Sequence, residues 1–270
     1  MMLAGDTSPD GTFARPIARH IARHIARTHV AHQHVERKHT ARRTSHVESV
    51  ALRTKHVRLA IFDLDGTLVD SQRDLANAAN ALVMELGGVS LREDDVAGMV
   101  GEGAAVLVRR VLVSARVDPE TPGALARFLA LYDERLTENT VAYDGIPAAL
   151  EDLRARMPLA VLTNKTQRAT DRLLTALDLS KYFTHAVGGD TPIGRKPEPT
   201  GLLRICSDAG IVPAEAVLVG DSPVDLETAR RAGTQVVLVS YGFGFRFDGV
   251  DLSGVPIAGH PSGLPLFLRT

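Results

Sequence analysis

The chain has 270 residues, enough for one α/β core with an inserted subdomain, and its hydrophobic content of 44% is ordinary for a folded domain. No apolar run approaches the roughly 20 residues of a membrane span, and an aromatic content of 4% without tryptophan argues against a platform for stacking nucleic-acid bases. The single cysteine, Cys206, excludes an internal disulfide and is typical of a reducing compartment, so we expect a cytoplasmic protein with a buried structural thiol.

The net charge of −1 conceals two parts of opposite charge. Residues 1–57 contain ten basic and four acidic residues, a net charge of +6, together with eight of the ten histidines, whereas residues 58–270 carry −7. The N-terminal part also repeats the pattern Ile-Ala-Arg-His at 17–20 and 21–24. This change in composition predicts a boundary at residue 57, just before the first apolar strand.

Several interpretations of the basic segment 1–57 are open. It can be a disordered extension or a stretch read from a wrongly assigned start, a basic helix that contacts nucleic acid, a membrane or a partner, or a histidine tract that binds metal. Its arginine-rich start also resembles an organellar transit peptide. The metal interpretation lacks cysteines or carboxylates at matching spacing around His20 and His24. We favour a disordered extension.

The first predicted strand, Leu59–Phe62, ends on two acidic residues. Asp63 and Asp65 lie two positions apart and are followed at once by Gly66 and Thr67. Open α/β sheets bind ligands beyond the carboxyl ends of their strands, and paired carboxylates at that edge suit Mg²⁺. The alternative is a strand that ends in an ordinary Asx turn.

A mainly helical insertion is predicted between this strand and the next. Ser71 is a candidate N-cap for a first helix, and two more helices are expected near 104–113 and 122–138. The segment 100–103 places two glycines around an acidic residue, which indicates a helix start that approaches another group closely. The insertion is either a bundle that only packs or a cover for a site on the sheet.

The end of the next predicted strand and a later loop carry polar residues that suit an anionic ligand. Thr163 and Asn164 follow the apolar stretch 158–162 and can hold a phosphate oxygen, although an N-cap for the following helix is the alternative. Lys196 precedes a proline before a helix predicted at 200–209, where its charge can offset an anionic group.

The last predicted strand end is acidic again. Asp221 follows the apolar stretch 216–219, and Asp225 lies four residues later, in the first turn of the next predicted helix. Favourable placement at a helix N-terminus is one interpretation of Asp225, and orientation of neighbouring site groups is the other.

In this order the motifs resemble those of the haloacid dehalogenase-like phosphatases, over nearly all of 59–240. The resemblance implies that Asp63 attacks phosphorus and forms an aspartyl-phosphate, and that Asp65 acts first as an acid and then as a base. It implies that the phosphoryl oxygens are held by Thr163, Asn164 and Lys196. It also implies a Mg²⁺ site made by Asp63, the backbone carbonyl of Asp65, and Asp221. Asp225 would orient these site groups without binding the metal directly.

Further features are similar to phosphoglycolate phosphatases, namely Thr163-Asn164-Lys165 and the segments 182–183, 188–190 and 195–197. This similarity implies hydrolysis of 2-phosphoglycolate to glycolate and phosphate. Candidates for binding the carboxylate of that substrate are Arg109, Arg110 and backbone amides near 101–103. The chain departs from the pattern in its basic segment and in its glycine- and proline-rich end, 241–270, which we expect to be loop-like.

The sequence thus predicts a doubly wound parallel sheet of Rossmann-like type, with a catalytic core at 58–72 and 142–270 and a small helical cap at 73–141. The expected protein is a magnesium-dependent phosphatase that acts on a small phosphorylated metabolite, with no membrane partner and an open oligomeric state. Related activities remain as alternatives: a pyrophosphatase, a nucleotidase, a sugar-phosphate phosphatase or a phosphosugar mutase. An alternative of another class is a non-catalytic binding protein that works through its basic segment.

Overall fold

The computed structural model describes residues 56–268, so the interpretations of the basic segment concern residues almost wholly outside that range. Val57 is an exception, because its side chain is fully buried and the folded core therefore begins just before the boundary expected at residue 58. Within 56–268, each helix is too short or too polar to cross a membrane.

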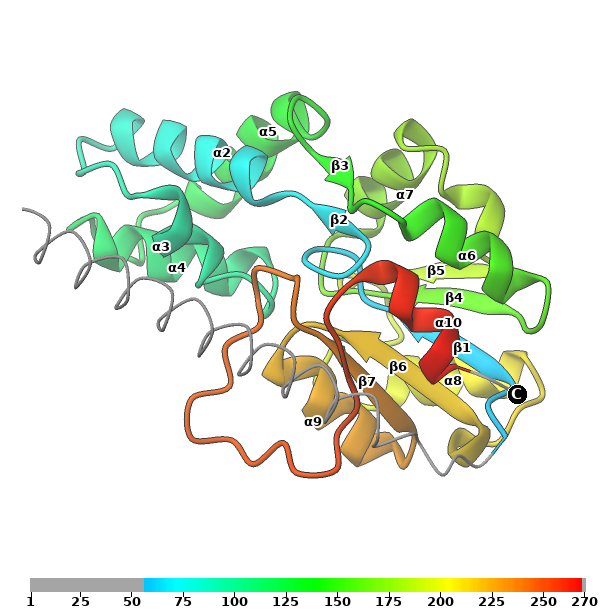
Figure 1. The fold of residues 1–270 in the computed structure, drawn as a ribbon. Coiled ribbons are helices and arrows are strands. Elements are labelled where there is room, and N and C mark those ends of the chain that lie inside the picture. The colour runs from blue at the N-terminus through cyan, green and yellow to red at the C-terminus, as the bar shows by residue number, and fades with distance from the viewer. Residues whose placement is uncertain (1–55, 269–270) are drawn as a thin grey trace, which may run out of the picture. The chain divides into compact units, whose positions relative to one another are not determined.

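The core is a six-stranded sheet in which all neighbouring strands are parallel (Figure 1). Across the sheet the strands are β5 (His185–Val187), β4 (Leu159–Leu162), β1 (Leu59–Phe62), β6 (Ala216–Gly220), β7 (Gln235–Val239) and β8 (Ile257–Ala258). Among the described residues, the first strand, β1, lies in the middle of the sheet, and later strands are added on both sides of it. The predicted doubly wound α/β fold is confirmed.

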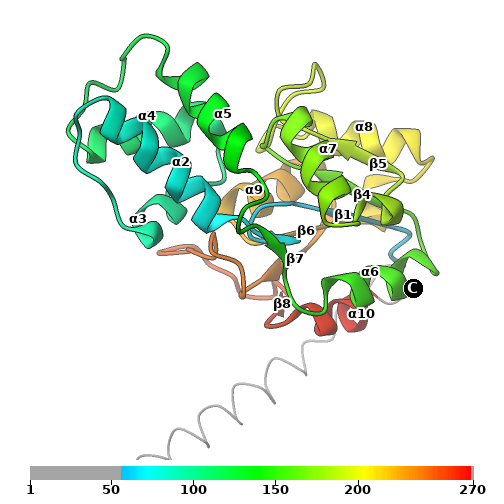
Figure 2. The same ribbon diagram turned by 90° about the horizontal axis from the view of Figure 1, so that it is seen from above.

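The alternation of side chains along the strands gives the sheet two apolar faces. Phe62 and Val219 pack on one face and Ile61 and Leu218 on the other. The first face is covered by α6 (Ile146–Arg154), α7 (Gln167–Ala176) and α10 (Leu264–Phe267), and the second by α8 (Thr200–Asp208) and α9 (Pro223–Ala232) (Figures 1 and 2). Cys206 on α8 is buried in the second layer, as expected, and burial raises the pKa of its thiol to about 11.

Of the helices between β1 and β4, the four that precede α6 form what we call the helical insertion. They are α2 (Gln72–Glu85), α3 (Glu93–Ala97), α4 (Ala104–Ser114) and α5 (Ala124–Arg135), and Figure 2 shows them grouped beside the sheet. An antiparallel pair, β2 (Val69–Asp70) and β3 (Val141–Ala142), connects them to the core. The helix expected at 122–138 is shorter at both ends, and α3 is an element that sequence periodicity did not predict.

The C-terminal part is more regular than expected. Residues 241–256 contain no helix or strand, but β8 then joins the edge of the sheet and α10 packs beside it. The side chains of Leu264 and Leu268 are fully buried. The loop-like expectation therefore agrees with 241–256 and is wrong for 257–268, where two leucines four positions apart lie on one side of a helical turn and pack into the core.

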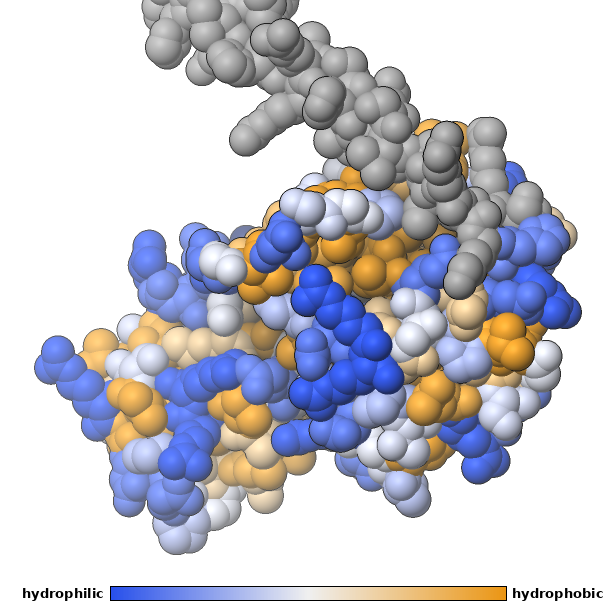
Figure 3. All heavy atoms as spheres, turned by 90° about the horizontal axis from the view of Figure 1, so that it is seen from below, coloured by the Kyte–Doolittle hydropathy of each residue, from blue (hydrophilic) through white to orange (hydrophobic). Residues whose placement is uncertain are grey.

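Large exposed apolar side chains are distributed over separate elements: Met84 lies near the end of α2, Val113 near the end of α4, Val212 before β6 and Leu266 in α10. On the face drawn in Figure 3, polar side chains separate several apolar groups. Single exposed apolar residues are ordinary on protein surfaces and do not mark an interface.

Candidate active site

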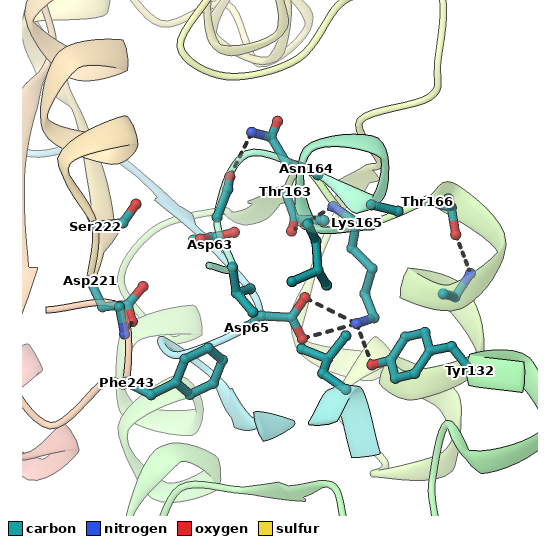
Figure 4. Close-up of a pocket in the computed structure, with 18 of the residues that line it drawn as sticks. Asp63, Asp65, Tyr132, Thr163, Asn164, Lys165, Thr166, Asp221, Ser222 and Phe243 are labelled. Carbon is teal, nitrogen blue, oxygen red and sulfur yellow. Dashed lines mark hydrogen bonds and ion pairs between the residues drawn. The ribbon is translucent and has the colours of Figure 1, made fainter. Parts of the chain in front are cut away.

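The polar residues predicted at strand ends meet at one edge of the sheet. Asp63 follows β1, Thr163 follows β4 and Asp221 follows β6, and these three strands are neighbours. Because neighbouring parallel strands end at the same edge, their terminal side chains face a common space. Figure 4 shows Asp63, Asp65, Thr163 and Asp221 around that space.

Lys196 links two of the predicted carboxylates. Its Nζ atom lies 2.8 Å from Asp63 Oδ1 and 2.6 Å from Asp225 Oδ1, and its side chain is 1% exposed. Burial alone would lower the pKa of Lys196, but the charges of Asp225 and Asp63 raise it above its ordinary value. Asp225 also accepts hydrogen bonds from the Ser222 amide, at 3.1 Å, and hydroxyl, at 2.6 Å, which completes a capping box on α9. Asp225 thus caps a helix and also contacts Lys196.

Three buried carboxylates form an oxygen cluster. Asp63, Asp221 and Asp225 each contribute an oxygen atom within 4.8 Å of the others. Burial raises the pKa of Asp63 to about 6, with Lys196 opposing and Asp225 adding to the rise. Burial and the charges of Asp225 and Asp63 raise the pKa of Asp221 well above its usual range. The three carboxylates carry more negative charge than Lys196 can balance. A buried group of oxygen ligands with excess negative charge fits a hard cation such as Mg²⁺.

The backbone comes very close to Asp221. The Gly244 amide donates a hydrogen bond of 2.7 Å to Asp221 Oδ2, and the Thr67 hydroxyl lies 3.4 Å from Oδ1. Gly66 has a φ of +83°, and a Cβ atom built on it would lie 2.0 Å from Asp221 Oδ2. Glycine is required at position 66 both for its backbone conformation and for the space that Asp221 occupies.

Asp65 faces a different group from Asp63. Lys165 Nζ lies 3.0 Å from both carboxylate oxygens of Asp65, and the Ser71 hydroxyl donates to Oδ1 at 2.5 Å. Ser71 is the N-cap residue of α2, as predicted, but its side chain contacts Asp65 and makes no capping hydrogen bond. Lys165 also donates to the Tyr132 hydroxyl at 2.6 Å. In the sequence, Lys165 stands out only within a segment similar to phosphoglycolate phosphatases, without a role of its own, and Tyr132 does not stand out.

Thr163 and Asn164 differ in what they offer to a ligand. Thr163 is buried beside the cluster, and its Oγ1 atom accepts a hydrogen bond of 3.3 Å from the Lys165 amide. The Asn164 side-chain nitrogen donates to the carbonyl oxygens of Gly101 and Lys196, each at 2.9 Å. Both of its N–H groups are thus used, and they tie the helical insertion to the core. Within 56–268, Asn164 Oδ1 is buried without a hydrogen-bond partner.

The helix N-cap considered as an alternative role for Thr163 and Asn164 is formed by a neighbouring residue. Thr166 is the N-cap of α7, and its hydroxyl accepts a hydrogen bond from the Ala169 amide at 3.4 Å. Thr163 and Asn164 are therefore left for contacts at the sheet edge.

A cavity of about 670 Å³, including its open mouth, lies between the sheet edge and the helical insertion. Its polar lining includes Asp63, Asp65, Thr163 and Asp221. Its apolar lining includes Leu75, Val100, Leu107, Phe128 and Phe243. Phe243 and Gly244 come from the segment after β7, and the only local signal for them is the pair of glycines around Phe243.

Arg109 and Arg110 do not line this cavity, so the expectation that they face the substrate is wrong. Arg109 lies 3.4 Å from Glu120, while Arg110 pairs with Glu102 and donates to the Met99 carbonyl oxygen. These partners within the insertion hold both guanidinium groups away from the site. The backbone of Gly101 and Gly103, in contrast, does line the cavity, as expected.

Comparison with known proteins places these features in a family. Residues 60–239 match the family model described as haloacid dehalogenase-like hydrolase. A phosphoglycolate phosphatase of Chromobacterium violaceum is 41% identical over 198 residues, which cover 71% of this chain and 89% of that protein. One from Rhodospirillum rubrum is 40% identical over 194 residues, covering 69% and 80%.

Solved structures agree with the sequence matches. A predicted phosphoglycolate phosphatase from Haemophilus somnus superposes with a TM-score of 0.72 at 29% identity, covering 78% of this chain and 97% of that one. A putative one from Lactobacillus delbrueckii subsp. bulgaricus gives 0.69 at 26% identity, covering 80% and 99%. With the carboxylate cluster and the ordered strand ends described above, these matches show that the chain belongs to the haloacid dehalogenase-like hydrolase family.

Proposed function

We propose that this protein is a magnesium-dependent phosphatase that hydrolyses 2-phosphoglycolate to glycolate and phosphate. The observation that carries the proposal is the different environment of the two aspartates after β1: Asp63 faces the carboxylate cluster and Lys196, while Asp65 faces the cavity and Lys165. Two carboxyl groups in different surroundings suit two different roles in one reaction. The names of the curated relatives support the choice of substrate.

In the proposed reaction, an Asp63 carboxylate oxygen attacks phosphorus, and the bond from phosphorus to the ester oxygen breaks. Asp65 gives its proton to that oxygen, so glycolate leaves and an aspartyl-phosphate remains on Asp63. Asp65 then takes a proton from a water molecule, whose oxygen attacks the same phosphorus and releases phosphate and the Asp63 carboxylate. Thr163 and Lys196 are proposed to hold the phosphoryl oxygens, and Asn164 to tie the insertion to the core.

The helical insertion is proposed to act as a cap. The contact between Asn164 and the Gly101 carbonyl oxygen and the apolar residues of α2, α4 and α5 in the cavity wall support this role. A cover of this kind keeps water away from the aspartyl-phosphate until the leaving group has departed. The single unpaired thiol, Cys206, supports a cytoplasmic location.

Removal of divalent metal should abolish phosphatase activity. Asp63, Asp221 and the backbone carbonyl of Asp65 would hold Mg²⁺, which would neutralise charge on the phosphoryl group. We expect release of phosphate to stop in excess EDTA and to return with added Mg²⁺. Ca²⁺ should substitute poorly because it is larger and prefers more ligands. Hydrolysis that continues undiminished in the chelator would contradict the metal role of Asp221.

Among small phosphate esters, 2-phosphoglycolate should have the highest kcat/KM. The test measures phosphate release from a panel of esters at one Mg²⁺ concentration. Ethyl phosphate is the informative control, because it has a leaving group of similar size without a carboxylate, and it should react at least tenfold more slowly. A sugar phosphate, nucleotide or pyrophosphate that exceeds 2-phosphoglycolate by tenfold would assign the protein to another branch of the family.

A further inference from the structure

The cavity contains one cationic side chain that the proposed reaction does not yet use. Among the cavity-lining residues within 56–268, Lys165 is the one lysine or arginine. Lys196, which pairs with Asp63 and Asp225, is already used in the proposed reaction to hold the phosphoryl group. Any negative charge on the leaving group of a substrate in this cavity therefore has Lys165 as its available cationic side-chain partner.

The Lys165 ammonium is buried and held in place by neighbouring side chains. Its side chain is 5% exposed, and its contacts are the Asp65 carboxylate and Tyr132. It lies 4.5 Å from the centre of the Tyr132 ring, and that ring is stacked on Phe128 with centroids 6.0 Å apart. The ammonium is therefore held at the join between the core, which supplies Lys165 and Asp65, and helix α5 of the insertion, which supplies Tyr132 (Figure 4).

We infer that Lys165 binds the carboxylate of the leaving group, with the Tyr132 hydroxyl as a second donor, and that this pair makes the enzyme selective for a carboxylated ester. The inference rests on the proposed phosphatase function and deepens it. It replaces Arg109 and Arg110, which the structure places outside the cavity.

The position of Asp65 supports this assignment. As the acid of the proposed reaction, Asp65 must reach the ester oxygen that leaves, and Lys165 lies 3.0 Å from both oxygens of Asp65. In 2-phosphoglycolate a single methylene carbon separates the ester oxygen from the carboxylate. A group that contacts Asp65 is thus close to that carboxylate when the ester is in place.

Lys165 and Tyr132 have enough N–H and O–H donors to bind a substrate carboxylate. A lysine ammonium has three N–H groups, so Lys165 can keep one hydrogen bond to Asp65 and one to Tyr132 and give the third to the substrate. Burial raises the pKa of Tyr132 to about 12, so its hydroxyl keeps its proton and can donate it while accepting from Lys165. The N-terminus of α4, at Gly103 and Ala104, lines the same cavity and favours an anion there.

The competing explanation is that Lys165 only orients Asp65. In that case its loss would weaken proton transfer to every leaving group equally, because each ester needs the same acid. A carboxylate contact, in contrast, affects only esters that carry the carboxylate. The ratio of kcat/KM for 2-phosphoglycolate to kcat/KM for ethyl phosphate separates the two explanations, since any change common to both esters cancels.

The experiment compares the full-length parent chain with Lys165→Met, which keeps the length of the side chain and removes its charge. We expect the ratio to fall at least tenfold in this variant. Tyr132→Phe keeps the stacked ring and removes only the hydroxyl, and the ratio should fall by about threefold. Lys181→Met is the matched control: it removes one positive charge from an exposed lysine paired with Asp178, and the ratio should stay that of the parent. Melting temperatures identify any variant that does not fold, and Tyr132→Phe tests the inference if Lys165→Met fails in this way.

A parent-like ratio in Lys165→Met, or in Tyr132→Phe if Lys165→Met does not fold, would overturn the inference even if both rates fell. Failure of the proposed function is recognised from the parent alone, by another ester that exceeds 2-phosphoglycolate. Suppose that another ester exceeds 2-phosphoglycolate, but the parent still prefers 2-phosphoglycolate to ethyl phosphate more than tenfold and Lys165→Met loses this preference. The carboxylate-binding role of Lys165 would then stand although the proposed substrate would not. A parent ratio near one would contradict both.

Discussion

Asp63→Asn should reduce phosphatase turnover by about 10³-fold or more while leaving the fold intact. An amide is not a nucleophile towards phosphorus, whereas its volume is nearly that of the carboxylate. The substitution also removes one negative charge from the buried cluster with Asp221 and Asp225, so the melting temperature should change by only a few degrees. The measurement is the initial rate of phosphate release from 2-phosphoglycolate with Mg²⁺, together with acid trapping of the phosphorylated enzyme.

Asp171→Asn is a matched control, since Asp171 is an exposed aspartate on α7 whose carboxylate contacts Gln167. Its activity should equal that of the parent. Activity of Asp63→Asn within tenfold of the parent, or an aspartyl-phosphate that still forms in the variant, would exclude Asp63 as the nucleophile.

Asp74→Ala should lower the free energy of unfolding by about 3 kcal/mol, which corresponds to a fall in melting temperature of roughly 6–12 °C. Asp74 lies in the first turn of α2 and is fully buried. Its carboxylate accepts hydrogen bonds from the backbone amides and side chains of Asn139 and Thr140, at 2.7 to 3.1 Å. These bonds fasten the first helix of the insertion to the segment that returns to the core, and alanine would leave the donors of the buried Thr140 without this partner.

The effect of Asp74 should also depend on pH. Burial alone would raise the pKa of Asp74, but the hydrogen bonds from Asn139 and Thr140 together lower it below its ordinary value. A carboxyl group whose pKa is lowered in the folded state contributes stability that is fully present above its unfolded pKa of about 3.9. This contribution is lost as the pH falls through the lower folded-state pKa.

Chemical denaturation of the parent and Asp74→Ala at several pH values measures this dependence. The difference in unfolding free energy should be constant between about pH 5 and 8 and should shrink below about pH 4. Asp95→Ala is the control, because Asp95 forms a solvent-exposed pair with Arg92 on the same insertion and should contribute little to stability. A difference for Asp74→Ala that grows in acid would contradict the role assigned to its hydrogen bonds.

Much of the core could be predicted from the sequence because it depends on local pattern. The strand Leu59–Phe62 is confirmed with its predicted ends, since a short apolar run bounded by a charged and a turn-forming residue leaves little choice. The meeting of Asp63, Thr163 and Asp221 at one sheet edge also follows, because parallel strands that alternate with helices must end on the same side. The segment from 257 onward was predicted poorly, since many glycines and prolines obscured the leucines that pack at α10.

Patterns along the chain were enough to predict the α/β fold and to place the acidic and polar candidates at strand ends, because strand periodicity and turn chemistry act over a few residues. The three-dimensional fold sets how the charges pair. Lys196 joins Asp63 and Asp225, Lys165 joins Asp65, and Arg110 turns to Glu102. It also brought Tyr132 and Phe243 to the cavity from distant segments. An ion pair depends on the distance between two side chains in space. The packing of the insertion against the sheet sets that distance, and no local pattern in the amino-acid sequence reports it.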